Sequence, residues 1–118
     1  MVNLKRGHVV WVNLDPTIGS EIRKKRPCVI VSNDAANLYF DRITLLPITS
    51  KKLEHIESFQ VFLPASLSGL SKDSKILAEQ IRTVSKKRVD PKPVTLLFDE
   101  LLEKIDQALK IHLDIKNS

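Results

Sequence analysis

Cysteine, glycine and aromatic residues are scarce in this chain of 118 residues. Cys28, the one cysteine, has no partner for an internal disulfide, and its place in the apolar run CVIV indicates a buried thiol rather than a nucleophile. Three glycines are too few for a glycine-rich phosphate loop. No apolar run approaches the ~20 residues that span a bilayer, and the N-terminus lacks the apolar core of a signal peptide. We therefore expect a cytoplasmic protein with no membrane association and no cofactor.

The three histidines do not have the spacing of a metal site. His8 stands at the start of an apolar run, His55 in a polar stretch and His112 in the last turn of a predicted helix. None has a cysteine, histidine or carboxylate at ligand spacing, and the dipole at a helix C-terminus is enough to explain His112. We expect no bound metal.

Positive charge is in excess and is unevenly distributed. The chain has a formal net charge of +5 and a pI near 9.5. Residues 1–26 hold six cations against two acids, whereas residues 99–118 hold three cations against five acids. This distribution favours one basic face and a polyanionic partner such as a nucleic acid.

Apolar patterning predicts several short strands followed by one helix. Strands are expected over 9–14, 28–33, 42–48 and 59–63, with a further strand or pair within 75–85 and a turn or short helix over 34–40. Pro47 implies an edge strand or a bulge. The apolar stripe from Leu101 to Leu113 repeats at helical spacing, with Asp99 as the expected N-cap. The sequence thus predicts a mainly β fold, a small strongly curved sheet or barrel closed by a C-terminal helix, in one domain over 1–118.

Five short motifs occur in a specific order. NLDPT ends the first strand and is followed by GSE; RP precedes the second strand; PITS ends the third; and LAEQIRT follows over residues 77–83. Together with the terminal helix, this combination resembles the MazF/PemK family of toxin endoribonucleases from bacterial toxin–antitoxin pairs. The resemblance runs from about Leu4 to the end of the helix.

The resemblance implies a fold, an activity and partners. Members of that family are small SH3-like barrels with a C-terminal helix, and they form homodimers. They cleave single-stranded RNA at short motifs without a metal, and a cognate MazE-like antitoxin neutralises them. The expected products are a 2′,3′-cyclic phosphate and a 5′-hydroxyl end.

The resemblance also implies which residues form the site. The arginine before the proline and the threonine that ends the third strand are the implied catalytic pair, here Arg26 and Thr49. The implied supporting or RNA-contacting residues are Ser20, Glu21, Lys24, Lys25, Ser50, Gln80 and Arg82. The loop bearing Arg23, Lys24 and Lys25 is more basic than expected of the family, which leaves the base preference open.

Elementary chemistry supports the roles of this pair. A planar guanidinium at Arg26 can hold two phosphate oxygens at once, and the hydroxyl of Thr49 can donate to the same oxygens. Arginine has a pKa above ~12 and is poorly suited to act as a base. We therefore expect Arg26 to stabilise the transition state and leave the proton acceptor open, with Glu21 as a candidate.

Two other functions compete with this interpretation. A CcdB-like gyrase poison shares the fold, but its activity resides near the end of the helix, and the tail here has no tryptophan. A non-catalytic nucleic-acid-binding barrel would want exposed aromatics for stacking, which are few. Structural alternatives also exist: a loop end for the RP pair, a strand residue without a role for Thr49, and a solvated linker for the basic residues 86–88.

Overall fold

A computed structural model describes residues 3–22 and 24–116. The strands are β1 (His8–Asn13), β2 (Lys25–Ile30), β3 (Arg42–Thr49), β4 (Gln60–Leu63), β5 (Ser74–Leu77), β6 (Arg82–Ser85) and β7 (Thr95–Leu96). The α-helices are α1 (Asp34–Tyr39), α2 (Ala65–Ser68) and α3 (Asp99–Leu113), and two single 3-10 turns are η1 (Ala78–Gln80) and η2 (Lys86–Arg88).

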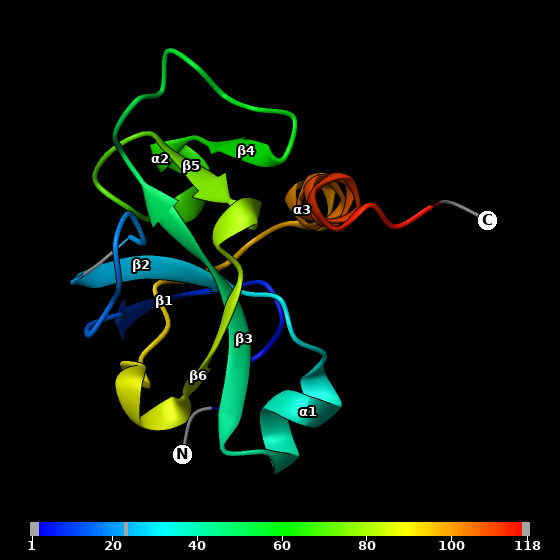
Figure 1. The fold of residues 1–118 in the computed structure, drawn as a ribbon. Helices are drawn as coiled ribbons and strands as arrows, with labels where there is room; N and C mark the ends of the chain where they lie inside the picture. Colours follow the sequence, from blue (N-terminus) through cyan, green and yellow to red (C-terminus); the bar gives the residue numbers. More distant parts are fainter. Residues whose placement is uncertain (1–2, 23, 117–118) are drawn as a thin grey trace.

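The strands form one antiparallel sheet in the order β4-β5-β3-β2-β1-β7, with β6 on β3 as a branch (Figure 1). One side of β3 pairs with β2. The other side pairs first with β6, over Arg42 to Leu45, and then with β5, at Ile48 and Thr49. A single bridge between Val12 and Val89 joins β1 to the chain that follows β6. Because this bridge connects the two ends of the β1-β2-β3-β6 ladder, that part of the sheet curls into a small barrel.

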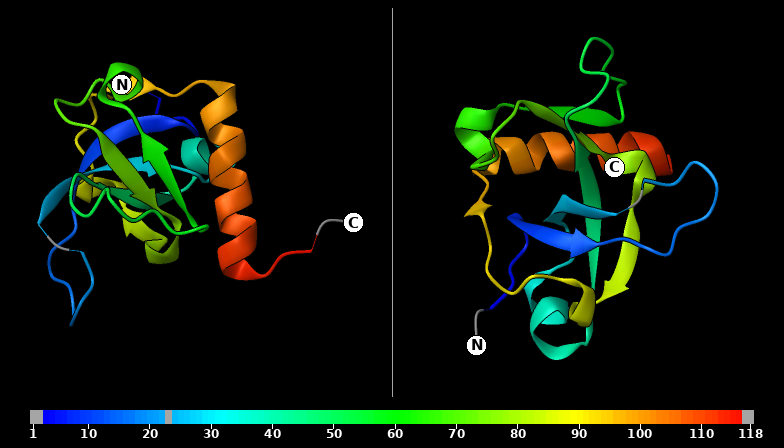
Figure 2. Two further views of the ribbon diagram at one scale, coloured as in Figure 1. Left: turned by 90° about the horizontal axis from the view of Figure 1, so that it is seen from above. Right: turned by 90° about the vertical axis from the view of Figure 1, so that its left-hand side faces the viewer.

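Two apolar cores lie on opposite faces of the curved sheet. Alternation along β1 sends Val9 to the first core and Val10 and Val12 to the second. The second core is inside the small barrel and includes Cys28. The first core is covered by α3, which lies along one side of the sheet (Figure 2) and contributes Leu101, Ile105 and Ala108. The position of the apolar stripe therefore decides which face of the sheet the helix can cover.

The predicted mainly β, strongly curved fold with a C-terminal helix is confirmed, but some strand positions differ. The second strand begins at Lys25 and ends at Ile30, since residues 25–27 pair with β1. Of the two alternatives predicted for Pro47, an edge strand or a bulge, the edge strand is wrong, because β3 is an interior strand. Pro47 lies between the β6-paired and the β5-paired parts of β3. Because it pairs with neither of these strands, its missing N–H group costs no inter-strand hydrogen bond on the side of β5 and β6.

Smaller differences concern the ends of elements. The N-cap of α3 is Phe98, so the helix begins at Asp99, one position earlier than predicted; Asp99 still places a carboxylate at the positive end of the helix. The further strand or pair predicted within residues 75–85 is a pair, β5 and β6, with η1 between them. The two-residue strand β7 was not predicted because it is too short to show alternation. No helix in residues 3–22 and 24–116 is long and apolar enough to cross a membrane.

Candidate nucleic-acid site

Arg26 is held by the sheet at the point where a basic loop enters it. It is the second residue of β2 and lies opposite Val12 of β1. Alternation along β2 places Arg26 on the same face as Cys28 and Ile30, which belong to the second core. The cation is therefore anchored by a buried strand, while its neighbours Lys24 and Lys25 are exposed.

A pocket of about 410 Å³ lies where the ends of β2, β3 and β5 meet η1. Two loops that project from the sheet, residues 14–22 and 51–59, also contribute to it (Figures 1 and 2). The lining residues are Ser20, Ile22, Arg26, Thr49, Lys51, Lys52, Gln60, Lys75, Leu77, Glu79 and Gln80. Four cations thus face one carboxylate, and this excess of positive charge suits a phosphate group. We call this space the central pocket.

Thr49 is placed at the wall of the central pocket by the last residue of β3. Its side chain is largely buried, with 9% of the residue exposed, and its Oγ1 accepts a hydrogen bond from the backbone N–H of Lys51 at 3.2 Å. Because the backbone N–H of Lys51 donates to one lone pair of Oγ1, the proton of this hydroxyl can still be donated to an anion. Arg26 and Thr49 therefore present a guanidinium and a hydroxyl to one space.

A second pocket, of about 380 Å³, adjoins the central one. It is lined by Ser20, Glu21, Glu79, Gln80, Ile81 and Arg82, of which three residues also line the central pocket. The Oε1 atom of Gln80 accepts a hydrogen bond from the backbone N–H of Ile22 at 2.8 Å. This bond ties the loop after β1 to η1 and fixes the boundary between the two pockets.

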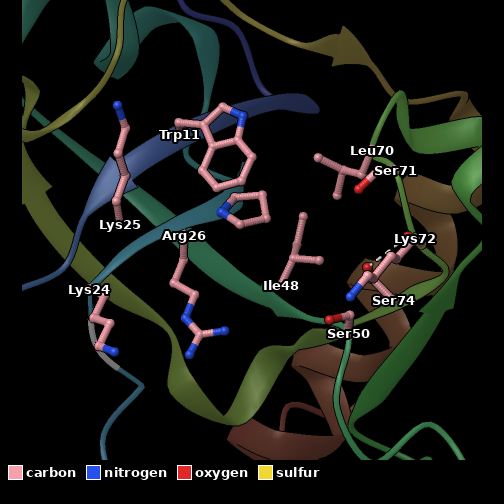
Figure 3. A pocket seen from close by; sticks show the side chains of 11 residues that line it. Trp11, Lys24, Lys25, Arg26, Ile48, Ser50, Leu70, Ser71, Lys72 and Ser74 are labelled. Atoms are coloured by element: carbon pink, nitrogen blue, oxygen red, sulfur yellow. Dashed lines mark hydrogen bonds between the residues drawn. The ribbon is translucent and has the colours of Figure 1, made fainter.

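A third pocket, of about 250 Å³, lies on the other side of Arg26 (Figure 3). Trp11, Pro27, Ile48 and Leu70 form an apolar wall, and the cations at residues 24–26 and Lys72 surround it. In Figure 3 the side chains of Arg26 and Ser50 point toward one another below this wall. Trp11 is 37% exposed, so one edge of an aromatic ring is open to a base or to an apolar partner.

The nine predicted site residues fall into these three adjoining pockets. Arg26, Thr49, Ser20 and Gln80 line the central pocket. Glu21 and Arg82 line the second, together with Ser20 and Gln80. Lys24, Lys25 and Ser50 line the third with Arg26. Arg23 lies outside the described residues.

Glu21 is not placed where the proton acceptor is needed. It does not line the central pocket. Its Oε1 accepts a hydrogen bond from the backbone N–H of Ile18 at 2.9 Å, which stabilises the turn through Gly19 and Ser20. The geometry therefore favours a role for Glu21 in shaping the loop.

Four charged residues of the central pocket were missed by the sequence analysis: Lys51, Lys52, Lys75 and Glu79. Lys51 and Lys52 belong to a stretch that looked like an ordinary polar loop. Lys75 is the more informative omission, because it lies in a strand whose four residues are all buried, and a lysine is rarely buried without a partner. Lys24 and Lys52 also adopt left-handed backbone conformations, with φ of 70° and 56°. Such conformations are costly for residues other than glycine and tend to gather at functional sites.

The pKa of the Cys28 thiol shows that two arginines lie close to the core. Burial raises the pKa of its thiol to about 12, although the positive charges of Arg82 and Arg26 act in the opposite direction. The thiol is therefore protonated and unreactive at neutral pH. Within residues 3–22 and 24–116, no three His, Cys, Asp or Glu side chains gather as metal ligands would.

Comparisons with known proteins show the family of the chain. Residues 5–113 match the family model of the PemK-like, MazF-like toxin of type II toxin–antitoxin systems. The chain is 41% identical to endoribonuclease MazF9 of Mycobacterium tuberculosis, over 95% of this chain and 98% of the relative. It is 37% identical to endoribonuclease EndoA of Bacillus subtilis, over 93% and 94%. A crystal structure of MazE-MazF from Deinococcus radiodurans contains a chain that superposes with a TM-score of 0.77 at 26% identity, over 98% of this chain and all of that chain.

The family match covers nearly the whole length of the chain. The fold and the basic pockets described above are consistent with it. The protein is a toxin of the PemK-like, MazF-like family of type II toxin–antitoxin systems.

Proposed function

We propose that this toxin is a cytoplasmic endoribonuclease that cleaves single-stranded RNA in its central pocket, without a metal. The observation that carries the proposal is that Arg26 and Thr49 line one pocket, with three lysines around them. The two curated relatives, at 41% and 37% identity, are named as endoribonucleases. The first line of support is geometric, and the second comes from the similarity of the whole sequence.

The chemistry is an intramolecular attack within the substrate. The 2′-hydroxyl loses its proton as its oxygen bonds to the adjacent phosphorus, and the bond from phosphorus to the 5′-oxygen breaks. The 5′-oxygen takes up a proton, which leaves a 2′,3′-cyclic phosphate on one fragment and a 5′-hydroxyl on the other. Negative charge grows on the phosphoryl oxygens during this step, and stabilising it lowers the barrier.

Arg26 and Thr49 are suited to that stabilisation. The guanidinium of Arg26 forms two parallel hydrogen bonds to phosphoryl oxygens, and the hydroxyl of Thr49 donates a third. Both side chains are positioned by strands, β2 and β3, so little reorganisation accompanies the reaction. The lysines of the pocket attract the backbone of the RNA and hold the flanking phosphates.

A cleavage assay on single-stranded RNA with excess EDTA tests the proposal. Discrete fragments should appear, and polynucleotide kinase should label their 5′ ends without prior phosphatase treatment, since those ends are hydroxyls. Protein carrying Arg26→Ala, purified in parallel, measures contaminating nuclease. Cleavage no faster than in that control, or cleavage that EDTA abolishes, would refute the proposal.

The three adjoining pockets, which together have an excess of positive charge, also suit an acidic inhibitor. We propose that a cognate antitoxin places an acidic, initially disordered segment across the three pockets and so excludes RNA. The Deinococcus radiodurans structure, described as MazE-MazF, supports an antitoxin partner for this chain. An acidic peptide from the antitoxin encoded beside the toxin gene should compete with RNA, and competition should weaken as salt is added.

We further propose that two copies of the chain form a homodimer. Large apolar side chains are exposed at the end of α1, where Leu38, Tyr39 and the C-cap residue Phe40 are 55%, 80% and 65% exposed. Ile111 and Leu113, near the end of α3, are about half exposed. Apolar surface of this kind favours burial against a second copy. Sedimentation equilibrium at micromolar protein concentration should give twice the mass of 13.4 kDa.

A further inference from the structure

One carboxylate lies among the cations of the central pocket. It belongs to Glu79 of η1, which follows β5 and packs against β3, the strand that ends at Thr49. Among the described residues that line this pocket, Glu79 is the one with an anionic side chain, against four cations. A negative charge at this place opposes the binding of RNA, because it repels phosphate. Its presence therefore needs a role other than the attraction of RNA.

The acceptor sites of this carboxylate are mostly unused. Within residues 3–22 and 24–116, no ion pair includes Glu79, although cations surround it. Its Oε2 accepts a hydrogen bond from Nε2 of Gln60 at 2.7 Å, and its Oε1 is buried without a partner. An ionised carboxylate has about four acceptor sites. Because buried polar groups are almost always hydrogen-bonded, the unused sites point to a donor that arrives with the substrate.

The other acceptors of the central pocket are engaged or are weak bases. Oε1 of Gln60 accepts a hydrogen bond from the backbone N–H of Glu57 at 3.1 Å, and Oε1 of Gln80 accepts one from that of Ile22 at 2.8 Å. The two hydroxyl groups of the pocket are much weaker bases than a carboxylate, and the cations have no acceptor site. None of the three histidines of the chain lines this pocket.

We propose that Glu79 is the proton acceptor for the attacking 2′-hydroxyl. This inference rests on the proposed cleavage of RNA, and it assigns the role that Glu21 is not placed to fill. Arg26 and Thr49 hold the phosphate, and the attacking oxygen belongs to the adjacent sugar, so the proton is released in the pocket that Glu79 lines. A positioned carboxylate that takes this proton lowers the barrier of the reaction.

The step balances in atoms and in charge. A carboxylate oxygen of Glu79 takes the proton as the 2′-oxygen bonds to phosphorus and the bond from phosphorus to the 5′-oxygen breaks. Water supplies the proton that the 5′-oxygen takes up, and the carboxylic acid then returns its own proton to the hydroxide that is left. The last torsion of a glutamate side chain is broad, so a rotation of the carboxylate presents either oxygen to the sugar.

The bond to Gln60 gives Glu79 a structural alternative. Through this amide the carboxylate is linked to the backbone of Glu57, within the loop of residues 51–59. If support of the loop were its whole role, the loss of Glu79 would weaken RNA binding. The loss of a proton acceptor instead slows the chemical step and leaves binding intact. The two roles therefore differ in whether affinity or rate responds.

Single-turnover cleavage of one RNA by Glu79→Gln tests the inference. Glutamine keeps the shape and can still accept from Gln60, but it is not a base, so the rate at saturating protein concentration should fall by about 100-fold or more. Affinity for the same RNA with a 2′-deoxy sugar at the cut should not fall, since a negative charge has left a basic pocket. Glu103→Gln on α3 makes the same change outside this pocket and should alter neither value.

Chemical rescue separates a missing base from a distorted site. Glu79→Ala should be slow and should regain rate when formate is added, because a small carboxylate can enter the vacated space and take the proton. Arg26→Ala lacks a donor rather than a base and should gain nothing from formate. An RNA with sulfur in place of the bridging 5′-oxygen should not restore Glu79→Gln, because sulfur leaves without a proton while the 2′-hydroxyl still needs a base.

The outcomes separate this inference from the proposed function. If wild-type protein does not cut RNA, the proposed function fails. The assignment of Glu79 alone is overturned if Glu79→Gln cuts at a rate near that of the wild type, or if its defect is confined to affinity. It is also overturned if formate does not rescue Glu79→Ala, or if the sulfur-substituted RNA restores Glu79→Gln, which would make this residue the donor to the leaving group.

Discussion

Thr49 lies directly opposite Lys75 in the ladder between β3 and β5. Lys75 is only 6% exposed, and its Nζ donates a hydrogen bond to the backbone carbonyl of His55 at 2.8 Å. One lysine therefore links the strand beside Thr49 to the loop that carries Lys51 and Lys52. A buried ammonium next to the predicted catalytic hydroxyl contributes charge to the pocket and also positions the loop above it.

Replacing Lys75 by methionine should weaken RNA binding more than it slows the chemical step. Removing one phosphate contact lowers the slope of log Kd against log salt by about 0.7 for a single strand. We expect KM to rise several-fold with a smaller change in kcat, measured at two or more salt concentrations. Lys116→Met changes an exposed lysine outside the pockets and should leave the slope unaltered. An unchanged slope in Lys75→Met, with an unfolding temperature like that of the wild type, would exclude a contact to RNA.

Arg26→Ala should abolish cleavage, with a loss of about 100- to 1000-fold or more in kcat, because a preorganised donor to the transition state disappears. Arg26→Lys should recover little of this loss, since a point charge cannot form two parallel hydrogen bonds. Single-turnover rates at saturating protein concentration measure the chemical step apart from binding. Near-normal rates in Arg26→Ala would remove this residue from the mechanism.

Thr49 offers a cleaner comparison, because its shape can be kept while the hydroxyl is removed. Thr49→Val should lower kcat by about 100-fold, as expected for a lost donor at the developing charge, while Thr49→Ser should keep most of the activity. The variant proteins are compared on one RNA under single-turnover conditions. Equal rates for the valine and serine variants would show that the hydroxyl has no part in the reaction.

Cys28 should be inert in the folded protein and should make stability fall at high pH. Its pKa is raised from 9.0 to about 12, so above pH 9 the unfolded chain loses the thiol proton while the folded chain keeps it. The unfolded state then binds fewer protons, and the free energy of unfolding falls with pH by up to about 1.4 kcal/mol per unit.

Urea titrations between pH 8 and 11 measure this slope, with Cys28→Ala as the matched variant. The difference in unfolding free energy between the two proteins should shrink as pH rises. Iodoacetamide should modify the thiol only in urea. Rapid modification without denaturant, or parallel pH curves for the two proteins, would show that the thiol is not buried as described.

The sequence predicted the elements whose periodicity is strong and missed those set by pairing. The apolar stripe of α3 and the alternation of β4, where Val61 and Leu63 are buried and Phe62 is exposed, appear directly in the residue pattern. The start of β2 does not, because Lys25 and Arg26 become part of a strand only through β1. Propensity is overridden here by tertiary pairing.

The candidate site also has residues that the sequence could predict and residues that only strand pairing brings together. Arg26 and Thr49 could be chosen because a resemblance attached roles to RP and PITS, whereas composition alone indicated only a basic face. Lys75 and Glu79 could not be chosen in this way, because their importance comes from which strands meet. The register that sets Lys75 opposite Thr49 joins positions 26 residues apart, and local patterns contain no information about that distance.

The single bridge from Val12 to Val89 also has a consequence for how the toxin is made. Arg26 and Thr49 leave the ribosome early, but β1 meets Val89 and β7 only when three quarters of the chain has been synthesised. Domains generally fold as units during synthesis, so the half-made chain has the parts of the pocket without the barrel that holds them. The nascent chain therefore lacks the closed barrel around its pocket until Val89 has been synthesised.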